Sequence, residues 1–272
     1  DATLATPAKQ AALGSLVDAL EQKAKANGAR ILLVKDVPHT MDNWAHDVLA
    51  AKGYARITAL PVSTLTVPAN EDEYFKSISG NMRSNLRRRL KRARNVRVEI
   101  RSSADGLADR LNELHDLTTS RGSNDYDQFA AVHKDFYDVV AREMPDNARL
   151  LTYWLDQQLI GFAMVLLGPN RMIQNYNGMC YPEGPDNGLF YLDWMTQLRL
   201  CMDNDIAEMQ SGVTTYLIKS RLGSKFHRSY VYVRHVYSPI NAIIRALSSN
   251  VNLEKDDPGL KELGDAAPFV TP

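Results

Sequence analysis

A tyrosine and a lysine in the last third of the chain have the spacing for acid–base chemistry. They lie in S-G-V-T-T-Y-L-I-K-S-R-L-G (Ser211–Gly223), where Gly212 permits a backbone kink or the close approach of a ligand. Tyr216 and Lys219 are three residues apart, so one helical turn would present both to the same space. The pattern predicts a general acid, Tyr216, beside a cation, Lys219, that binds an anion or lowers the tyrosine pKa. The alternative interpretation is an ordinary strand–turn–helix junction with solvated polar side chains.

Two polar side chains occupy the strand-like stretch just before this segment. Glu208 and Gln210 alternate with an apolar residue, so both lie on one face of the strand expected at Ile206–Gln210. A carboxylate and an amide in that position could bind an amine or deprotonate it, directly or through water. The alternative for Glu208 is a plain edge-strand carboxylate.

The apolar periodicity predicts the elements that must position these residues. Helices are expected at Pro7–Asn27, Asp42–Lys52, Ser103–Arg121, Phe129–Met144 and Gly188–Asp203. Strands are expected at Arg30–Val37, Val96–Ile100, Arg149–Leu155, Leu159–Leu167, Arg171–Met179, Ile206–Gln210 and Tyr230–Val236, with one or two more in Tyr54–Val67. Gly122–Gln128 is expected to be a loop, and the chain after Leu247 a polar tail.

The order of these elements indicates an α/β protein. From Val96 onward, neighbouring strands can pair as hairpins and a later helix crosses over the sheet. The segment Pro7–Val67 follows the back half of the same order, so the two parts are interpreted as degenerate copies.

Composition limits the class of protein. With 272 residues, two domains are plausible, and 44% hydrophobic and 24% charged residues are typical of a globular chain. Acidic and basic residues balance at 32 each, so net charge points to no partner. The sequence has no apolar run long enough for a membrane span and no secretory-signal pattern. The two cysteines and six histidines lack metal-ligand spacing. We therefore expect a cytoplasmic protein without a metal.

Three blocks, in this order, carry a family resemblance over roughly Glu73–His235. They are M-R-S-N-L-R-R-R-L-K-R-A, the stretch Tyr153–Gly178 with L-D-Q-Q-L-I-G-F-A-M-V-L and N-Y-N-G-M, and G-V-T-T-Y-L-I-K-S-R-L-G. The chain resembles the FemAB-like group of the GNAT superfamily, which are predicted N-acyltransferases with two GNAT-type halves.

The resemblance implies a GNAT-like mixed, mostly antiparallel sheet flanked by helices. The implied domains are a partial GNAT-like half at 1–80, an arginine-rich connecting helix at 81–95, an acyltransferase domain at 96–247 and a polar tail at 248–272. Three departures stand out. Asp1 begins at what would be a later helix of the first half, the usual pyrophosphate signature is absent before the helix at Gly188, and Cys180 replaces a frequent acidic residue.

Such a fold implies direct attack of an amine on an acyl group, without a covalent enzyme intermediate. A bulged strand at Asn175–Gly178 could direct backbone N–H groups of Asn177 and Gly178 at the acyl carbonyl, or simply be a strand end. The helix N-terminus at Gly188 could hold a phosphate, although Glu183 and Asp186 oppose an anion there.

The helix that ends at Arg121 faces the acceptor cleft in the GNAT fold. The resemblance therefore makes His115 and Arg121 candidate acceptor contacts, with Arg121 suited to a carboxylate. The alternatives are a satisfied core or surface histidine and a cation at a helix C-terminus.

The arginine-rich block Asn81–Arg94 contains six arginines and one lysine and no acid. Leu86 and Leu90 are four residues apart, so one face packs and the arginines fan outward. The block, including Arg88, could contact CoA or carrier-protein phosphates, or a nucleic acid such as the aminoacyl-tRNA of Fem-type ligases. The alternative is a solvated helix that pairs with the protein's own acids.

These inferences lead to one expected function and two rivals. We expect transfer of an acyl group from acyl-CoA or an acyl-carrier thioester to the amine of a small or amino-acid-like acceptor. The rivals are aminoacyl-tRNA-dependent amide formation, and a non-catalytic module that binds nucleic acid or another anionic polymer.

Overall fold

The computed structural model describes residues 4–121 and 132–270. Its contacts divide the chain into two compact units. The first unit comprises Asp1–Ser63, Val213–Ser220 and Lys225–Pro272, and the second comprises Thr64–Gly212 and Arg221–Ser224.

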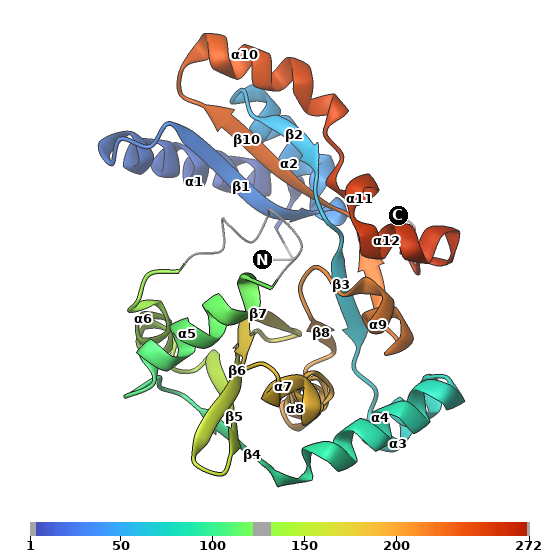
Figure 1. Ribbon diagram of the computed structural model, residues 1–272. Coiled ribbons are helices and arrows are strands. Elements are labelled where there is room, and N and C mark those ends of the chain that lie inside the picture. Colours follow the sequence, from blue (N-terminus) through green and yellow to red (C-terminus); the bar gives the residue numbers. More distant parts are fainter. Residues whose placement is uncertain (1–3, 122–131, 271–272) are drawn as a thin grey trace. The chain divides into compact units, whose positions relative to one another are not determined.

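A three-stranded sheet forms the centre of the first unit. Its elements are α1 (Thr6–Ala26), β1 (Ile31–Pro38), α2 (His39–Ala51), β2 (Ala55–Thr58) and, from much later in the chain, β10 (Ser229–His235) and α10 (Ser238–Leu247). Strand β10 lies between β1 and β2 and is antiparallel to both (Figure 1). Leu32 and Tyr232 point to the sheet face that the helices cover, where they form a core with Val17 of α1 and Leu49 of α2.

A smaller core in the first unit is built from the C-terminal part of the chain. Its elements are α9 (Tyr216–Arg221), β9 (Lys225–His227), α11 (Leu253–Asp256) and α12 (Pro258–Leu263). Tyr216, Phe226 and Leu260 bury one another. The Asp257 carboxylate caps α12 by accepting a hydrogen bond from the Leu260 N–H at 2.9 Å.

The second unit contains a larger sheet with helices on both faces. Its elements are β3 (Val62–Thr66), α3 (Glu71–Ser77), α4 (Gly80–Arg92), β4 (Val96–Arg101), α5 (Ala108–Thr119), α6 (Phe136–Glu143), β5 (Ala148–Leu155), β6 (Gln158–Leu167), β7 (Arg171–Met179), α7 (Glu183–Asp186), α8 (Leu189–Asp203) and β8 (Glu208–Gln210). These strands are ordered β4-β5-β6-β7-β8-β3. Neighbours from β4 to β7 are antiparallel, and α8 crosses over so that β8 is parallel to β7.

Two glycines let the helices approach the middle of this sheet. A Cβ on Gly161 would lie 2.4 Å from the Leu189 side chain of α8, and a Cβ on Gly178 would lie 2.5 Å from the Leu114 backbone of α5. Gly161 pairs with Met179 and Gly178 pairs with Phe162. Because neighbouring residues of a strand point to opposite faces, α8 and α5 pack on opposite faces of the sheet.

The predicted fold class is confirmed, because the chain is a mixed α/β protein with open sheets flanked by helices. The predicted strands are present, and Tyr54–Val67 contains two strands, β2 and β3. The loop expected at Gly122–Gln128 lies outside the described residues. The helix expected from Phe129 begins at Phe136 in the described part of the chain.

Four local features differ from the expectations. Strand β10 completes the sheet of the first unit instead of the second, because its partners are β1 and β2. The second helix begins at His39, three residues before the expected start. The segment after Leu247 contains α11 and α12, since Leu260 gives it an apolar anchor. The boundaries of the compact units also differ from the expected domain boundaries.

Candidate functional site

The strands β7 and β8 run in parallel for only three residues before they part. The paired residues run from Arg171 opposite Glu208 to Ile173 opposite Gln210. Gly212, two residues after β8, has a φ of 70°, a left-handed conformation that turns the chain out of the strand direction. Parallel neighbours that stop pairing leave backbone donors and acceptors on both strands available to a ligand.

A bulge in β7 lies directly after the end of this pairing. On the β6 side, Met164 pairs with Tyr176 and Val165 pairs with Gln174, so Asn175 is the extra residue. The bulge is thus present at the first position of the range predicted for it. Bulges re-aim side chains and leave a backbone group outside the ladder, which suits a strand that must present N–H groups to an acyl carbonyl.

The C-terminal half of β7 packs against α5, and this contact brings three predicted site residues together. A ring nitrogen of His115 lies 3.4 Å from the Asn177 carbonyl oxygen, and the ring meets Tyr176 edge-on at 5.5 Å. Gly178 provides the space for α5. His115 is buried, and Gly178 has a packing role that accounts for the absence of a side chain.

Arg121 lies just beyond the C-terminus of α5, where its guanidinium stacks 4.3 Å above the Tyr181 ring. The Met179 N–H donates to Thr118 Oγ1 at 2.9 Å, which fixes this end of the helix to the end of β7. Arg121 is exposed, so its guanidinium edge remains accessible for a carboxylate or phosphate.

Glu208 and Gln210 lie on β8 as predicted, but the carboxylate is engaged. Two guanidinium nitrogens of Arg171 donate to one Glu208 oxygen at 2.8 and 3.1 Å. Glu208 therefore fits a structural role at the paired end of β7 and β8 better than proton abstraction.

Asp193 is an ionisable residue in this unit that the sequence-based prediction missed. It lies on α8, on the same sheet face as Gly161, and its carboxylate accepts hydrogen bonds from Tyr153 at 2.6 Å, Gln197 at 2.7 Å and Gln174 at 3.3 Å. All three donors are neutral, and desolvation raises the pKa of Asp193 to about 6. In the sequence, the feature that could have identified Asp193 is an acidic residue inside the apolar run L-F-Y-L-D-W-M.

The position of Gln174 connects Asp193 to the bulge. Gln174 is the last residue of β7 before Asn175, and its side-chain amide reaches the Asp193 carboxylate. A carboxyl group that titrates near neutrality is thereby placed one residue from the point where β7 leaves its regular ladder.

Tyr216 and Lys219 belong to the first unit, and both are buried. The Tyr216 hydroxyl donates to the Pro61 carbonyl oxygen at 2.8 Å, its ring meets Phe226 at 5.1 Å, and burial raises its pKa. The Lys219 ammonium donates to the Val213 carbonyl oxygen at 3.0 Å, and desolvation lowers its pKa to about 7. These contacts favour a core role for Tyr216 and leave Lys219 as the group that titrates near neutrality.

The start of α8 is packed against the arginine-rich helix α4. Gly188 has a φ of 66°, and a Cβ there would lie 2.8 Å from the Arg89 carbonyl oxygen. This close approach explains the glycine without a bound phosphate.

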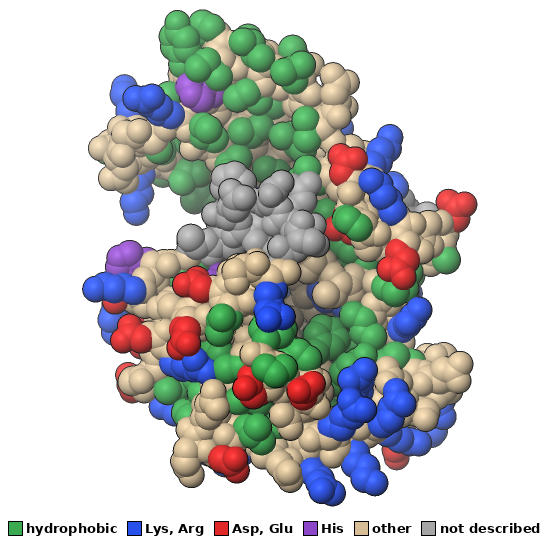
Figure 2. Space-filling model, viewed as in Figure 1, with side chains coloured by type: hydrophobic (Ala, Val, Ile, Leu, Met, Phe, Trp, Pro, Cys, Tyr) green, Lys and Arg blue, Asp and Glu red, His purple; other side chains and the backbone are tan. Residues whose placement is uncertain are grey.

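Helix α4 buries Met82 and Leu86 and exposes most of its cations, as predicted. The exposed cations of this helix and the following turn, which we call the α4 cation row, are Arg87, Arg88, Lys91, Arg92 and Arg94. None of them forms an ion pair with an acid in the described part of the chain. Figure 2 shows Lys and Arg side chains gathered in the region where Figure 1 labels α3 and α4. Four of the row, with Asn95 and Asp186, line a cavity of about 570 Å³.

Two searches of the described residues gave no candidates. Across residues 4–121 and 132–270, no cluster of three or more His, Cys, Asp or Glu side chains could hold a metal ion. No helix in the same ranges has the length and apolarity needed to cross a bilayer.

Known proteins share this architecture. Residues 80–208 match the family model of the acetyltransferase (GNAT) domain. The crystal structure of FemX is similar, with a TM-score of 0.60 and 16% identity over 87% of this chain and 79% of that chain. No curated protein sequence matches the chain.

Two further solved structures share the fold. One is the C-terminal domain (DUF2156) of a putative lysylphosphatidylglycerol synthetase from Agrobacterium fabrum, with a TM-score of 0.53 and 14% identity over 86% of this chain and 76% of that chain. The other is L-PGS from Bacillus licheniformis, with a TM-score of 0.53 and 10% identity over 85% of this chain and 76% of that chain. The family model identifies residues 80–208 as a GNAT acyltransferase domain, and the fold shared with these solved structures agrees with the resemblance seen in the sequence.

Proposed function

We propose that the chain forms an amide by transferring an aminoacyl group from an aminoacyl-tRNA to the amine of an amino-acid-like acceptor. The observation that carries this choice of donor is the α4 cation row, whose five cations have no acidic partner among the described residues. One phosphate-bearing CoA would occupy few of them, whereas a tRNA backbone presents a charge at every nucleotide. The resemblance to Fem-type ligases supports the same donor.

Acyl-CoA is the second candidate donor, because residues 80–208 match the acetyltransferase (GNAT) domain. The cavity beside Arg88 and Arg92 is also compatible with the phosphates of a CoA or a carrier protein. Two observations weigh against acyl-CoA as the donor. Gly188 is explained by its approach to Arg89, and Asp186 places a carboxylate on the cavity wall.

With either donor the chemistry is direct attack. The acceptor nitrogen forms a bond to the acyl carbon, and the bond from that carbon to the leaving oxygen or sulfur breaks. The proton that the nitrogen loses passes through a base to the leaving group, which departs as a hydroxyl or a thiol. The bulge at Asn175 supplies candidate N–H donors for the developing oxyanion. Asp193, in the same unit as the bulge, is the candidate group for proton transfer, since burial raises its pKa to about 6.

Neither cysteine fits a covalent mechanism. Cys201 is buried beside Met172, and desolvation raises the pKa of its thiol to about 12. Cys180 accepts a hydrogen bond from Arg110, but burial still raises its pKa. Nucleophilic thiols need the opposite shift.

The test offers both donors to the intact protein. Purified protein is incubated with a panel of amino-acid amines and either a mixture of aminoacylated tRNAs or acetyl-CoA, and mass spectrometry detects the amide. We expect products from the tRNA arm that disappear after RNase treatment. Amide formation from acetyl-CoA alone would establish the second candidate. Activity with neither donor, together with salt-dependent RNA binding, would support a binding module instead.

The α4 cation row gives a sharper prediction for the donor. Arg88→Gln and Arg92→Gln should each weaken tRNA binding at low salt and reduce the salt slope of log K by about one, because each removes about one phosphate contact. Arg142→Gln is the matched control, since Arg142 is an exposed arginine of the same unit that pairs with Glu143. An equal effect of all three variants would contradict a specific role for the row.

A further inference from the structure

The first unit presents a continuous apolar surface on strands and a helix that its own core does not use. We call it the α10 face; its exposed members are Ile31, Leu33, Val236, Tyr237, Ile240, Ile243 and Leu247. Ile243 is 60% exposed, Tyr237 59% and Leu247 56%. Figure 2 shows hydrophobic side chains gathered over the region of α10 and the neighbouring strands of this unit. Contiguous apolar surface of this kind marks an interaction site.

Helix α10 is attached to the unit with its polar side inward. The Asn241 amide donates to the Gly53 carbonyl oxygen at 2.9 Å, and its oxygen accepts from the His235 N–H at 3.0 Å. No residue of the helix is buried. Ile240, Ile243 and Leu247 follow helical spacing and form one stripe, so this amphipathic helix has the orientation opposite to that of a core helix.

The charged side chains next to the α10 face are mostly basic. On α10 itself the charged residue is Arg245, which is exposed. Arg30 and Lys35 are exposed beside Ile31 and Leu33 of β1. Asp36, on the bulge of β1, is the adjacent carboxylate. The basic residues next to the α10 face therefore favour an anionic partner.

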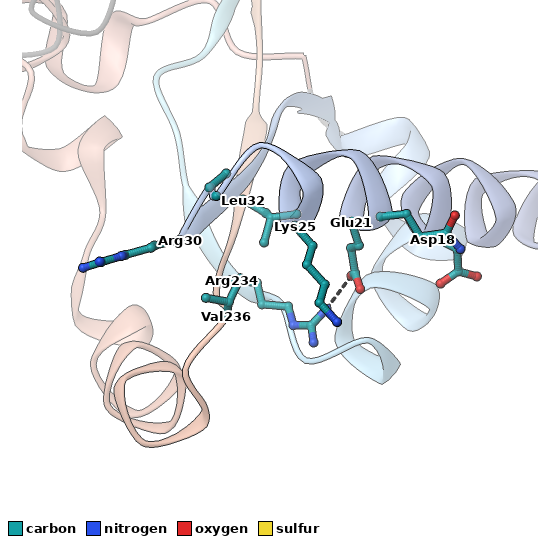
Figure 3. Close-up of a pocket in the computed structure, with 10 residues that line it drawn as sticks. Asp18, Glu21, Lys25, Arg30, Leu32, Arg234 and Val236 are labelled. Carbon is teal, nitrogen blue, oxygen red and sulfur yellow. Dashed lines mark ion pairs between the residues drawn. The ribbon is translucent and has the colours of Figure 1, made fainter.

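A cavity on the side of the sheet that α1 covers forms a polar niche. It has a volume of about 640 Å³, and Arg30 and Val236 are among the residues that line it. Glu21 pairs with Arg234 there at 2.5 Å. In Figure 3 the Lys25 side chain extends toward Arg234, whereas Arg30 points away from that pair. Lys25 and Arg30 form no ion pair with any acid that the structure describes, so the niche carries excess positive charge.

We propose that the α10 face of the first unit binds the surface of an anionic lipid membrane. The isoleucine stripe and Tyr237 enter the boundary between headgroups and acyl chains, and Lys35 and Arg245 meet lipid phosphates. A symmetric contact with a second copy is disfavoured, because a two-fold axis would bring the basic residues next to the α10 face of both copies together. This binding is separate from the α4 cation row, which lies in the other unit.

Vesicle flotation tests the proposal on the whole chain. The protein is mixed with phosphatidylcholine vesicles with and without phosphatidylglycerol, and the fraction that floats gives the partition coefficient. We expect binding to the anionic vesicles, weaker binding to the neutral ones, and a loss of about tenfold or more in the Ile243→Asn/Leu247→Asn variant. Both side chains are exposed, so circular dichroism should show an unchanged fold.

The matched control is Leu16→Asn/Leu20→Asn, which changes two exposed leucines of α1 outside the α10 face. It should bind like the wild type. Lys35→Gln/Arg245→Gln should lower the preference for phosphatidylglycerol while retaining binding to neutral vesicles. The proposal is overturned if the wild type fails to float with anionic vesicles or if the control loses as much binding as the α10 variant. Self-association that Ile243→Asn/Leu247→Asn abolishes, without vesicle binding, would assign the face to a second copy.

Discussion

Two ionisable side chains, Asp193 and Lys219, titrate near neutrality because the interior disfavours their charged forms. Asp193 is surrounded by hydroxyl and amide donors without a cation, and Lys219 reaches a backbone carbonyl oxygen. Neutral partners compensate only part of the lost hydration. At each residue, this burial also makes protein stability depend on pH.

Asp193→Asn should remove one pH dependence of the free energy of unfolding. The pKa of Asp193 in the folded state, about 6, lies above the ordinary aspartate pKa of 3.8, so between these values the folded protein binds more protons than the unfolded chain. Asp193 therefore lowers the free energy of unfolding as pH rises from about 4 to 6, with a limiting slope of about 1.4 kcal/mol per pH unit. Denaturant unfolding across this range should give a flatter profile for Asp193→Asn. An unchanged profile would show that Asp193 ionises normally.

Lys219→Met should remove a dependence of the opposite sign at higher pH. The folded-state pKa of Lys219, about 7, lies below the ordinary lysine pKa of 10.5, so between these values the unfolded chain binds more protons. Lys219 therefore increases the free energy of unfolding as pH rises from about 7 to 10.5. We expect the variant to lack this rise in thermal unfolding experiments. Lys225→Met, at an exposed lysine of the same unit, should retain it.

At the scale of elements, the contact between α5 and β7 depends on the missing side chain of Gly178. Gly178→Ala would place a Cβ 2.5 Å from the Leu114 backbone, so helix and strand must separate at a cost of about 1–3 kcal/mol. The free energy of unfolding from denaturant titration measures this cost.

Gly80→Ala is the control for that substitution. A Cβ at Gly80, in the first turn of α4, meets nothing within 4 Å, so alanine should be neutral or slightly stabilising there. If Gly178→Ala is equally neutral, the close approach of α5 does not explain the glycine, and a role of its N–H at the acyl group gains weight.

At the scale of the whole molecule, the first unit depends on a strand far away in the sequence. Tyr232 of β10 is fully buried between elements from the first 60 residues. Tyr232→Ala should cost about 3–5 kcal/mol and speed amide hydrogen exchange in β1 and β2, while β5 and β6 of the second unit remain protected. Phe162→Ala, in β6, should give the reverse distribution. Equal deprotection of both units by both variants would show that they unfold as one.

The sequence by itself determined the fold class and most strands and helices. Apolar alternation and turn residues are local signals, and they suffice for β5, β6 and β7 with their tight connections. The order of three blocks was enough to indicate the GNAT superfamily. The bulge near Asn175 and the outward arginines of α4 could also be predicted, because each depends on residues close together in the chain.

Only the tertiary structure decided how distant residues combine. It placed β10 between β1 and β2, buried the Tyr216 hydroxyl against Pro61, occupied Glu208 with Arg171, and gave Asp193 three neutral donors. Periodicity reports which face of an element is apolar, but it does not report what covers that face or which polar group meets another. Those choices depend on long-range packing, and they determine which of the candidate residues keep a group available for chemistry.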